Sequence, residues 1–216
     1  MKNLIFILTL TIFAAGFSEV TAQEATQFEK LLEKNVLLLD SIKDKDTCED
    51  VLFRFERLRK VSPDEWLPSY YSAYCKLILT RWRIDKEDLT NEAISQLEET
   101  IKTANNSEVM TLLARAYMTK IELQKSSGPR YTGKVKTLLK DAVEKDPNNP
   151  RAFLMYGKFY YYFPGFVGGD KEKGIKLFEK AAPIFESEKV KNDEKYTYLP
   201  HWGKNLNEWY LKTFKK

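Results

Sequence analysis

The sequence is poor in the residues that bind transition metals. Its 216 residues include only two cysteines, Cys48 and Cys75, and one histidine, His201. A structural zinc site takes four such ligands, so this small set excludes one. A lone histidine with no serine or cysteine motif around it is also a poor candidate for nucleophilic catalysis. We therefore expect no metal, no cofactor and no enzymatic activity, and we expect His201 to cap or to pack against Trp202.

The chain also lacks an excess of charge of one sign. Its 35 basic and 31 acidic residues are interspersed and leave a formal net charge of +4. No basic block is dense enough to indicate nucleic-acid binding. Hydrophobic residues make up 43% of the chain, which is enough for a packed core and argues against disorder.

Long apolar runs are missing everywhere except near the N-terminus. Lys2 is followed by an apolar run from Leu4 to Ala15, and Val20-Thr21-Ala22 fits a signal-peptidase cleavage site. The run is too short for a membrane span of about 20 residues, and the pattern is typical of a secretory signal peptide. The absence of a cysteine at the cleavage site disfavours a lipoprotein. We predict a signal peptide at residues 1–22, one domain at residues 23–216, and an exported protein of the periplasm or medium.

Export changes what the two cysteines imply. In an oxidising compartment Cys48 and Cys75 can form a disulfide. They can equally remain buried thiols that pack as small apolar residues. The sequence leaves both alternatives open, because the geometry that a disulfide requires is not visible in it.

The most informative pattern is a repeat. Segments that begin at Val51, Ala93, Val135 and Gly174 are separated by 42, 42 and 39 residues. Each has apolar or small residues at i, i+4 and, in most cases, i+7. A repeat of this length and pattern predicts helical hairpins stacked into a solenoid.

Apolar periodicity and turn residues predict about nine helices and no strand. The expected ranges are Glu24–Ile42, Asp46–Val61, Glu65–Trp82, Asp88–Thr103, Glu108–Lys125, Gly133–Lys145, Arg151–Phe163, Asp170–Ser187 and Lys204–Phe214. Asp46 or Thr47 is expected to cap the second helix, and Asp170 the eighth. The glycine-rich stretch Gly165–Asp170 lacks the lysine and the preceding strand of a phosphate loop, so we expect it to be a tight interhelical loop.

These residues resemble the tetratricopeptide-repeat family. The resemblance is carried by large, small and aromatic residues at the family's positions, namely Phe153, Tyr156, Gly157, Tyr160, Gly174, Phe178 and Ala181, and in the preceding repeat Met110, Leu113, Ala114, Tyr117, Val135, Leu139 and Ala142. The unit here is about 40 residues, longer than the family's 34. The resemblance implies an all-α, right-handed solenoid of about four hairpins with a C-terminal capping helix.

Four further motifs resemble those of exported tetratricopeptide proteins of Gram-negative bacteria, a group that implies no activity. They are Glu65–Tyr71, Asp146–Ala152, Phe166–Asp170 and Pro200–Gly203. A weaker similarity is to periplasmic repeat proteins that assist solute transporters. The first hypothesis is thus a non-catalytic scaffold for a protein or peptide in the cell envelope. The alternative is a small-ligand-binding accessory protein of a transport system.

The same register predicts a binding face. Ala73, Ala114 and Gly157 are 41 and 43 residues apart and mark the sides along which the hairpins pack. Side chains on the opposite sides of these helices are expected to line a concave groove, and tyrosine and arginine are frequent in binding surfaces. The predicted groove residues are Tyr70, Tyr74, Thr111, Arg115, Lys158, Tyr161 and Tyr162. An open groove would favour a peptide, and an enclosed tyrosine-lined cavity would favour a small ligand.

Overall fold

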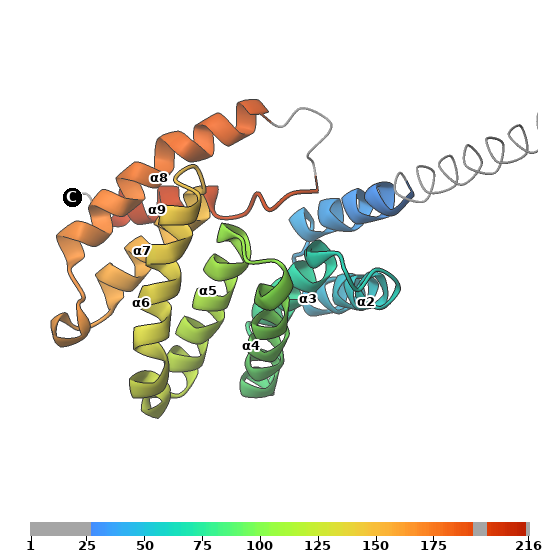
Figure 1. Ribbon diagram of the computed structural model, residues 1–216, viewed down its shortest axis with the longest axis horizontal. Helices are drawn as coiled ribbons and strands as arrows, with labels where there is room; N and C mark the ends of the chain where they lie inside the picture. Colours follow the sequence, from blue (N-terminus) through green and yellow to red (C-terminus); the bar gives the residue numbers. More distant parts are fainter. Residues whose placement is uncertain (1–26, 192–197, 215–216) are drawn as a thin grey trace, which may run out of the picture.

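The computed structural model describes residues 27–191 and 198–214, and these residues form helices joined by short loops, with no strand among them (Figure 1). The first helix covers residues 27–40. The others are α2 (Lys45–Val61), α3 (Trp66–Leu79), α4 (Lys86–Thr103), α5 (Ser107–Leu123), α6 (Gly128–Lys145), α7 (Pro150–Tyr162), α8 (Lys171–Lys191) and α9 (Lys204–Phe214). The predicted all-α fold is confirmed.

Consecutive helices pack side by side as hairpins. The pairs α3–α4, α5–α6 and α7–α8 are in contact, and α3, α5 and α7 also contact one another in that order. The helix over residues 27–40 buries Leu32 and Val36 in the core that α2 and α3 share. This gives four hairpins, with α9 packed on α8 as the expected C-terminal addition. We call the side of α3, α5 and α7 that residues 198–214 cover the inner face.

Small residues stand where helices approach closely, as the repeat predicted. Ala73, Ala114 and Ala181 have no exposed surface. Gly157 of α7 lies against Gly174 of α8, and a Cβ atom added to Gly157 would come within 2.6 Å of the Phe178 ring. Real Cβ atoms do not approach that closely, so only glycine allows α7 and α8 to pack at this distance.

Several helix boundaries differ from the sequence prediction. Asp44 caps α2 by accepting a hydrogen bond from Thr47 N at 2.8 Å, ahead of the two residues that we expected. α6 begins at Gly128 and not at Gly133, with Pro129 in its first turn. Proline is well tolerated there because first-turn N–H groups have no partner within the helix. Asp170 does cap α8 as predicted, since its carboxylate accepts from Lys173 N at 3.0 Å.

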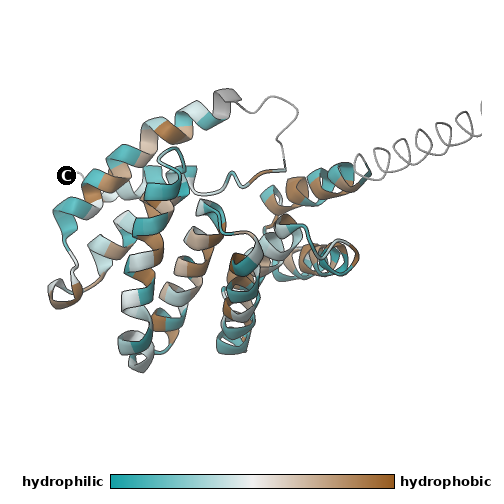
Figure 2. Ribbon diagram, viewed as in Figure 1, coloured by the Kyte–Doolittle hydropathy of each residue, from teal (hydrophilic) through white to brown (hydrophobic). Residues whose placement is uncertain are grey.

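Hydropathy follows the two layers of the solenoid. α2 and α4 present long hydrophilic stretches, whereas α5 and α7 are more hydrophobic (Figure 2). This is expected because α5 and α7 are packed between neighbours, while α2 and α4 have a free side. No helix among the described residues is apolar enough over a sufficient length to cross a membrane. The predicted signal peptide lies outside the described residues.

Candidate functional site: the inner face and its aromatic surface

The C-terminal segment crosses the inner face and covers much of the predicted groove. Residues 198–203 run from the helix over residues 27–40 and α3 toward α7, and α9 then packs against α8 (Figure 1). Tyr71 donates a hydrogen bond to Tyr198 O at 2.7 Å, and the His201 ring lies 3.1 Å from the Asp40 carboxylate. The inner face is therefore not the open groove that the sequence predicted.

A glycine sets the turn from this segment into α9. Gly203 has φ of +109°, and a Cβ there would lie 2.9 Å from Leu154 and 3.1 Å from Phe185. Both the left-handed backbone and the close approach require glycine. The direction in which α9 continues from residues 198–203 is therefore fixed by this position.

Two of the predicted groove residues are fully buried. Tyr70 accepts a hydrogen bond from Trp202 Nε1 at 2.7 Å and lies 3.3 Å from Glu108 Oε2, and none of its surface is exposed. Burial raises the pKa of Tyr70 well above its ordinary value. Thr111 is also fully buried and donates to Ser107 O of its own helix at 2.7 Å. The expectation that these two side chains face an open groove is wrong. Trp202 covers Tyr70, and the buried Thr111 hydroxyl has its hydrogen-bond partner within α5.

Tyr74 and Arg115 are brought together by Trp202. The Tyr74 and Trp202 rings stack with centres 5.6 Å apart. The Arg115 guanidinium carbon lies 5.1 Å from the Tyr74 ring centre and 4.9 Å from that of Trp202. These are favourable cation–π distances, so both predicted residues contribute to holding the C-terminal segment.

The remaining three predicted residues gather at the other end of the inner face. Lys158 forms an ion pair with Glu122 at 2.9 Å. Tyr161 stacks on Phe214 at 4.0 Å, and Tyr162 lies 6.3 Å from the same ring. Half of the Tyr162 surface is exposed. Whether any of the seven residues contacts a partner remains a prediction.

α9 supplies further aromatic rings here that the sequence analysis did not select. Tyr210 stacks on Phe178 at 4.6 Å and is buried, whereas Trp209 is 51% exposed and lies 5.8 Å from Phe214. We call this group the α7–α9 aromatic surface, and it consists of Tyr161, Tyr162, Trp209, Tyr210 and Phe214. The signal in the sequence was the aromatic spacing in α9, which we read only as a capping helix.

Burial raises the pKa values of two tyrosines of this surface, Tyr162 and Tyr210. Both phenols are therefore neutral near pH 7. The surface offers apolar ring faces with neutral hydroxyls, bordered by the ammonium groups of Lys158 and of Lys171, which lies 5.6 Å from the Tyr161 ring centre.

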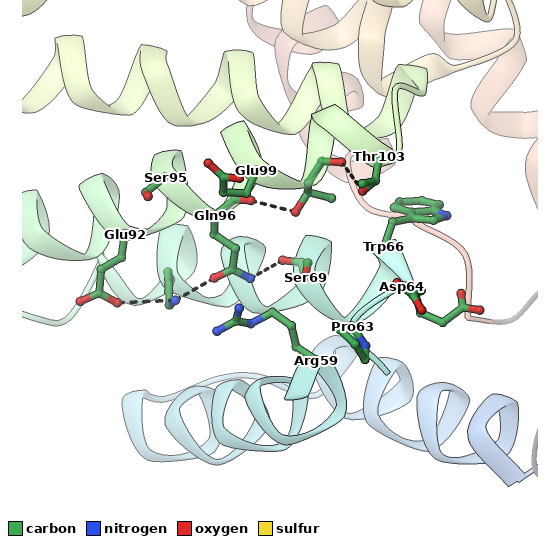
Figure 3. Close-up of a pocket in the computed structure, with 13 residues that line it drawn as sticks. Arg59, Pro63, Asp64, Trp66, Ser69, Glu92, Ser95, Gln96, Glu99 and Thr103 are labelled. Carbon is green, nitrogen blue, oxygen red and sulfur yellow. Dashed lines mark hydrogen bonds and ion pairs between the residues drawn. The ribbon is translucent and has the colours of Figure 1, made fainter. Parts of the chain in front are cut away.

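A separate cavity lies between the ends of α2, α3 and α4 (Figure 3). It has a volume of about 540 Å³, and the polar residues of its lining include Arg59, Lys76, Glu92 and Gln96. Lys76 donates to Glu56 at 3.0 Å and to Gln96 at 2.9 Å. The sequence analysis missed this cavity because its lining comes from three helices with no shared motif.

The charges around this cavity neutralise one another. Burial opposes ionisation of Glu56, but hydrogen bonds from Ser72, Arg59 and Lys76 lower its pKa to about 2. Glu92 is paired with Lys76 at 3.5 Å, and Glu99 with Lys102 at 2.6 Å. The network ties α2, α3 and α4 together.

The His201 ring pairs with the Asp40 carboxylate, a partner that the sequence analysis did not name. One ring nitrogen faces Leu199 O at 2.9 Å and the other faces Asp40. The hydrogen bond with Asp40 raises the pKa of His201. Among the described residues, no three His, Cys, Asp or Glu side chains cluster as a metal site would require.

Solved structures with the same architecture exist. No family model matches the sequence, and no curated protein matches it. The structure is similar to the HusA haemophore from Porphyromonas gingivalis, with a TM-score of 0.75 and 25% identity over 87% of this chain and 92% of that one. It is also similar to TTC0263, a thermophilic TPR protein of Thermus thermophilus, with a TM-score of 0.58 and 21% identity over 73% and 74% of the two chains. The chain thus has a tetratricopeptide-like fold.

Proposed function

We propose that this protein is a non-catalytic binding protein for a planar, anionic aromatic ligand of the tetrapyrrole class, such as haem. The observation that carries the proposal is the likeness to the HusA haemophore, which extends over nearly the whole of both chains. It favours the small-ligand alternative over a peptide scaffold. The position of the C-terminal segment also favours a small ligand, because this segment occupies the face on which a peptide would lie in an open solenoid.

The α7–α9 aromatic surface is the proposed binding site. Tyr162 and Trp209 each expose half of their surface and flank the Phe214 ring. Aromatic rings bind flat conjugated systems by stacking and by burying apolar area. A tetrapyrrole is such a system and is large enough to contact both rings at once.

Nearby cations suit the carboxylates of such a ligand. Lys158 of α7 forms an ion pair with Glu122, and Lys171 borders the Tyr161 ring. A propionate group at the edge of a tetrapyrrole can replace or share the Glu122 partner of Lys158. A charge-assisted contact of this kind orients the ligand while the rings supply most of the affinity.

Iron ligation by histidine is not needed for this mode of binding. Both ring nitrogens of His201, the only histidine of the chain, already face oxygen partners. We therefore expect recognition of the macrocycle itself, with iron-free protoporphyrin bound as well as haemin.

Absorbance and fluorescence titrations with haemin and with protoporphyrin test the proposal. The double variant Tyr162→Ala/Trp209→Ala should bind both at least about tenfold more weakly, because each stacked ring contributes about 0.5–1.5 kcal/mol beyond area burial. Phe53→Ala, at an exposed phenylalanine of α2, is the matched control and should bind normally. No binding by the wild type, or equal binding by the double variant, would contradict the proposal.

A protein partner is the second candidate. The tetratricopeptide-like fold supports it, because stacked helical hairpins are widely used as binding scaffolds. The exposed rings of the α7–α9 aromatic surface are equally suited to a protein contact. Crosslinking in the native envelope distinguishes a protein partner from a tetrapyrrole ligand. A protein partner would be crosslinked at Trp209 even when no tetrapyrrole is present.

We also propose that the protein is exported. The basis is the N-terminal pattern at residues 1–22. Fractionation of native cells with an antibody against the mature chain tests this location.

A further inference from the structure

The two cysteines of the chain meet in the folded structure. Cys48 is in the first turns of α2 and Cys75 is near the end of α3, 27 residues later. The Cys48 thiol donates a hydrogen bond to the backbone oxygen of Cys75 at 3.7 Å. Neither residue has any exposed surface.

This juxtaposition is not dictated by the repeat. A thiol at either place alone would serve as a small core residue, and the repeat pattern asks for nothing more at these positions. A chain with only two cysteines has few ways to bring them into contact by accident. The pair is also placed where a bond between them would join two neighbouring helices.

We propose that Cys48 and Cys75 form a disulfide bond that joins α2 to α3 when the protein folds under oxidising conditions. The structure shows the two residues as thiols, so it represents the reduced form. The bond would join α2 and α3, which belong to neighbouring hairpins, at the end opposite the turn that connects them. Closing a loop of this length removes conformational freedom from the unfolded chain and stabilises the folded one.

The chemistry is thiol–disulfide exchange with a small disulfide oxidant. The Cys48 thiolate attacks one sulfur of the oxidant, forms a mixed disulfide and releases one thiolate. The Cys75 thiol then loses its proton to solvent and attacks Cys48 Sγ, which forms the protein disulfide and releases the second thiolate. Two protein thiols are oxidised and one oxidant disulfide is reduced to two thiols, so atoms and electrons balance.

The environment makes Cys48 the attacking residue. Its place in the first turns of α2 puts it at the positive end of the helix dipole, which favours a thiolate. Because both sulfurs are buried in the folded chain, exchange must take place before α2 and α3 have fully packed together.

The test uses the mature chain refolded in a buffer of reduced and oxidised glutathione. The product is denatured, treated with an alkylating reagent and analysed by mass spectrometry without reduction. We expect a protein lighter by two hydrogen atoms, with no alkylated cysteine and one linked peptide pair that contains Cys48 and Cys75. Two alkylated cysteines, or glutathione left on Cys48, would overturn the proposal.

A thermal measurement provides an independent readout. Dithiothreitol should lower the melting temperature of the oxidised wild type by about 5–10 °C. The variant Cys48→Ala/Cys75→Ala is the matched control, and its melting temperature should not respond to the reductant. An oxidised wild type that melts at the same temperature with and without dithiothreitol would overturn the stabilising role. These outcomes do not depend on ligand binding by the α7–α9 aromatic surface.

Discussion

The guanidinium of Arg115 lies over the indole of Trp202, with the Arg115 Cζ atom 4.9 Å from the ring centre. This contact joins α5 to a residue that follows Arg115 by 87 positions (202 − 115). Trp202 also stacks on Tyr74 and donates a hydrogen bond to Tyr70. The C-terminal segment is therefore part of the folded core, and its removal would affect stability as well as any binding site.

Trp202→Ala tests this conclusion. Loss of the stack, the cation–π contact and the hydrogen bond should lower the free energy of unfolding by about 2–4 kcal/mol. Trp209→Ala is the control, because that side chain is half exposed and its loss should cost about 1 kcal/mol or less. Urea denaturation measures both variants, and equal losses would show that residues 198–203 do not hold the inner face.

The predicted groove residues should now separate into two classes. Tyr162→Ala should change the free energy of unfolding by within about 0.5 kcal/mol, as is usual for exposed positions. Tyr74→Ala and Arg115→Ala should each cost more, because they pack against Trp202. Thermal melts of the three single variants measure this, and three equal, negligible shifts would favour the open groove that the sequence indicated.

The contact between α7 and α8 gives a matched pair of glycine substitutions. Gly157→Ala places a Cβ 2.6 Å from Phe178 and should destabilise the protein by about 1–3 kcal/mol. Gly133→Ala meets no atom within 4 Å inside α6 and should stabilise by about 0.5–1 kcal/mol. Opposite shifts in melting temperature are expected, and a neutral Gly157 variant would show that the two helices can move apart at little cost.

Stability should depend on pH through His201. Its pKa is raised in the folded state above the ordinary value of 6.5 by the hydrogen bond with Asp40. The protonated form is thus favoured by folding, so the contribution is complete below pH 6.5 and is lost as the pH rises through the folded pKa. The wild type should exceed Asp40→Asn in melting temperature at pH 6 and should match it at pH 9. A difference that persists unchanged at pH 9 would assign the effect to something other than this pair.

Export predicts a defined N-terminus. Mass spectrometry of native material should find a chain that begins at or near Gln23 and carries no lipid, because the cleavage pattern ends at Ala22 and has no cysteine. A chain that retains Met1 would contradict this prediction.

The sequence by itself determined the repeat and most of the helices. Helix formation and hairpin packing depend on apolar and small residues at fixed local spacings, so Ala114, Gly157, Gly174 and Ala181 could be placed without coordinates. The cap at Asp170 was predicted for the same reason, since a cap bonds to a residue three places away. The cap at Asp44 and the start of α6 were missed because several polar residues in one loop can serve, and the packing of the hairpin selects among them.

Only the tertiary structure decided what the inner face does. Periodicity correctly grouped Tyr74, Arg115 and Tyr162 on the inner helices, but it carries no information about which distant segment will cover them. Trp202 reaches Tyr70 across 132 residues, and Asp40 reaches His201 across 161. Such contacts depend on the direction in which Gly203 turns the chain and on the stacking of all four hairpins. The separation between buried Tyr70 and half-exposed Tyr162 therefore follows from the path of the C-terminal segment, which local sequence does not specify.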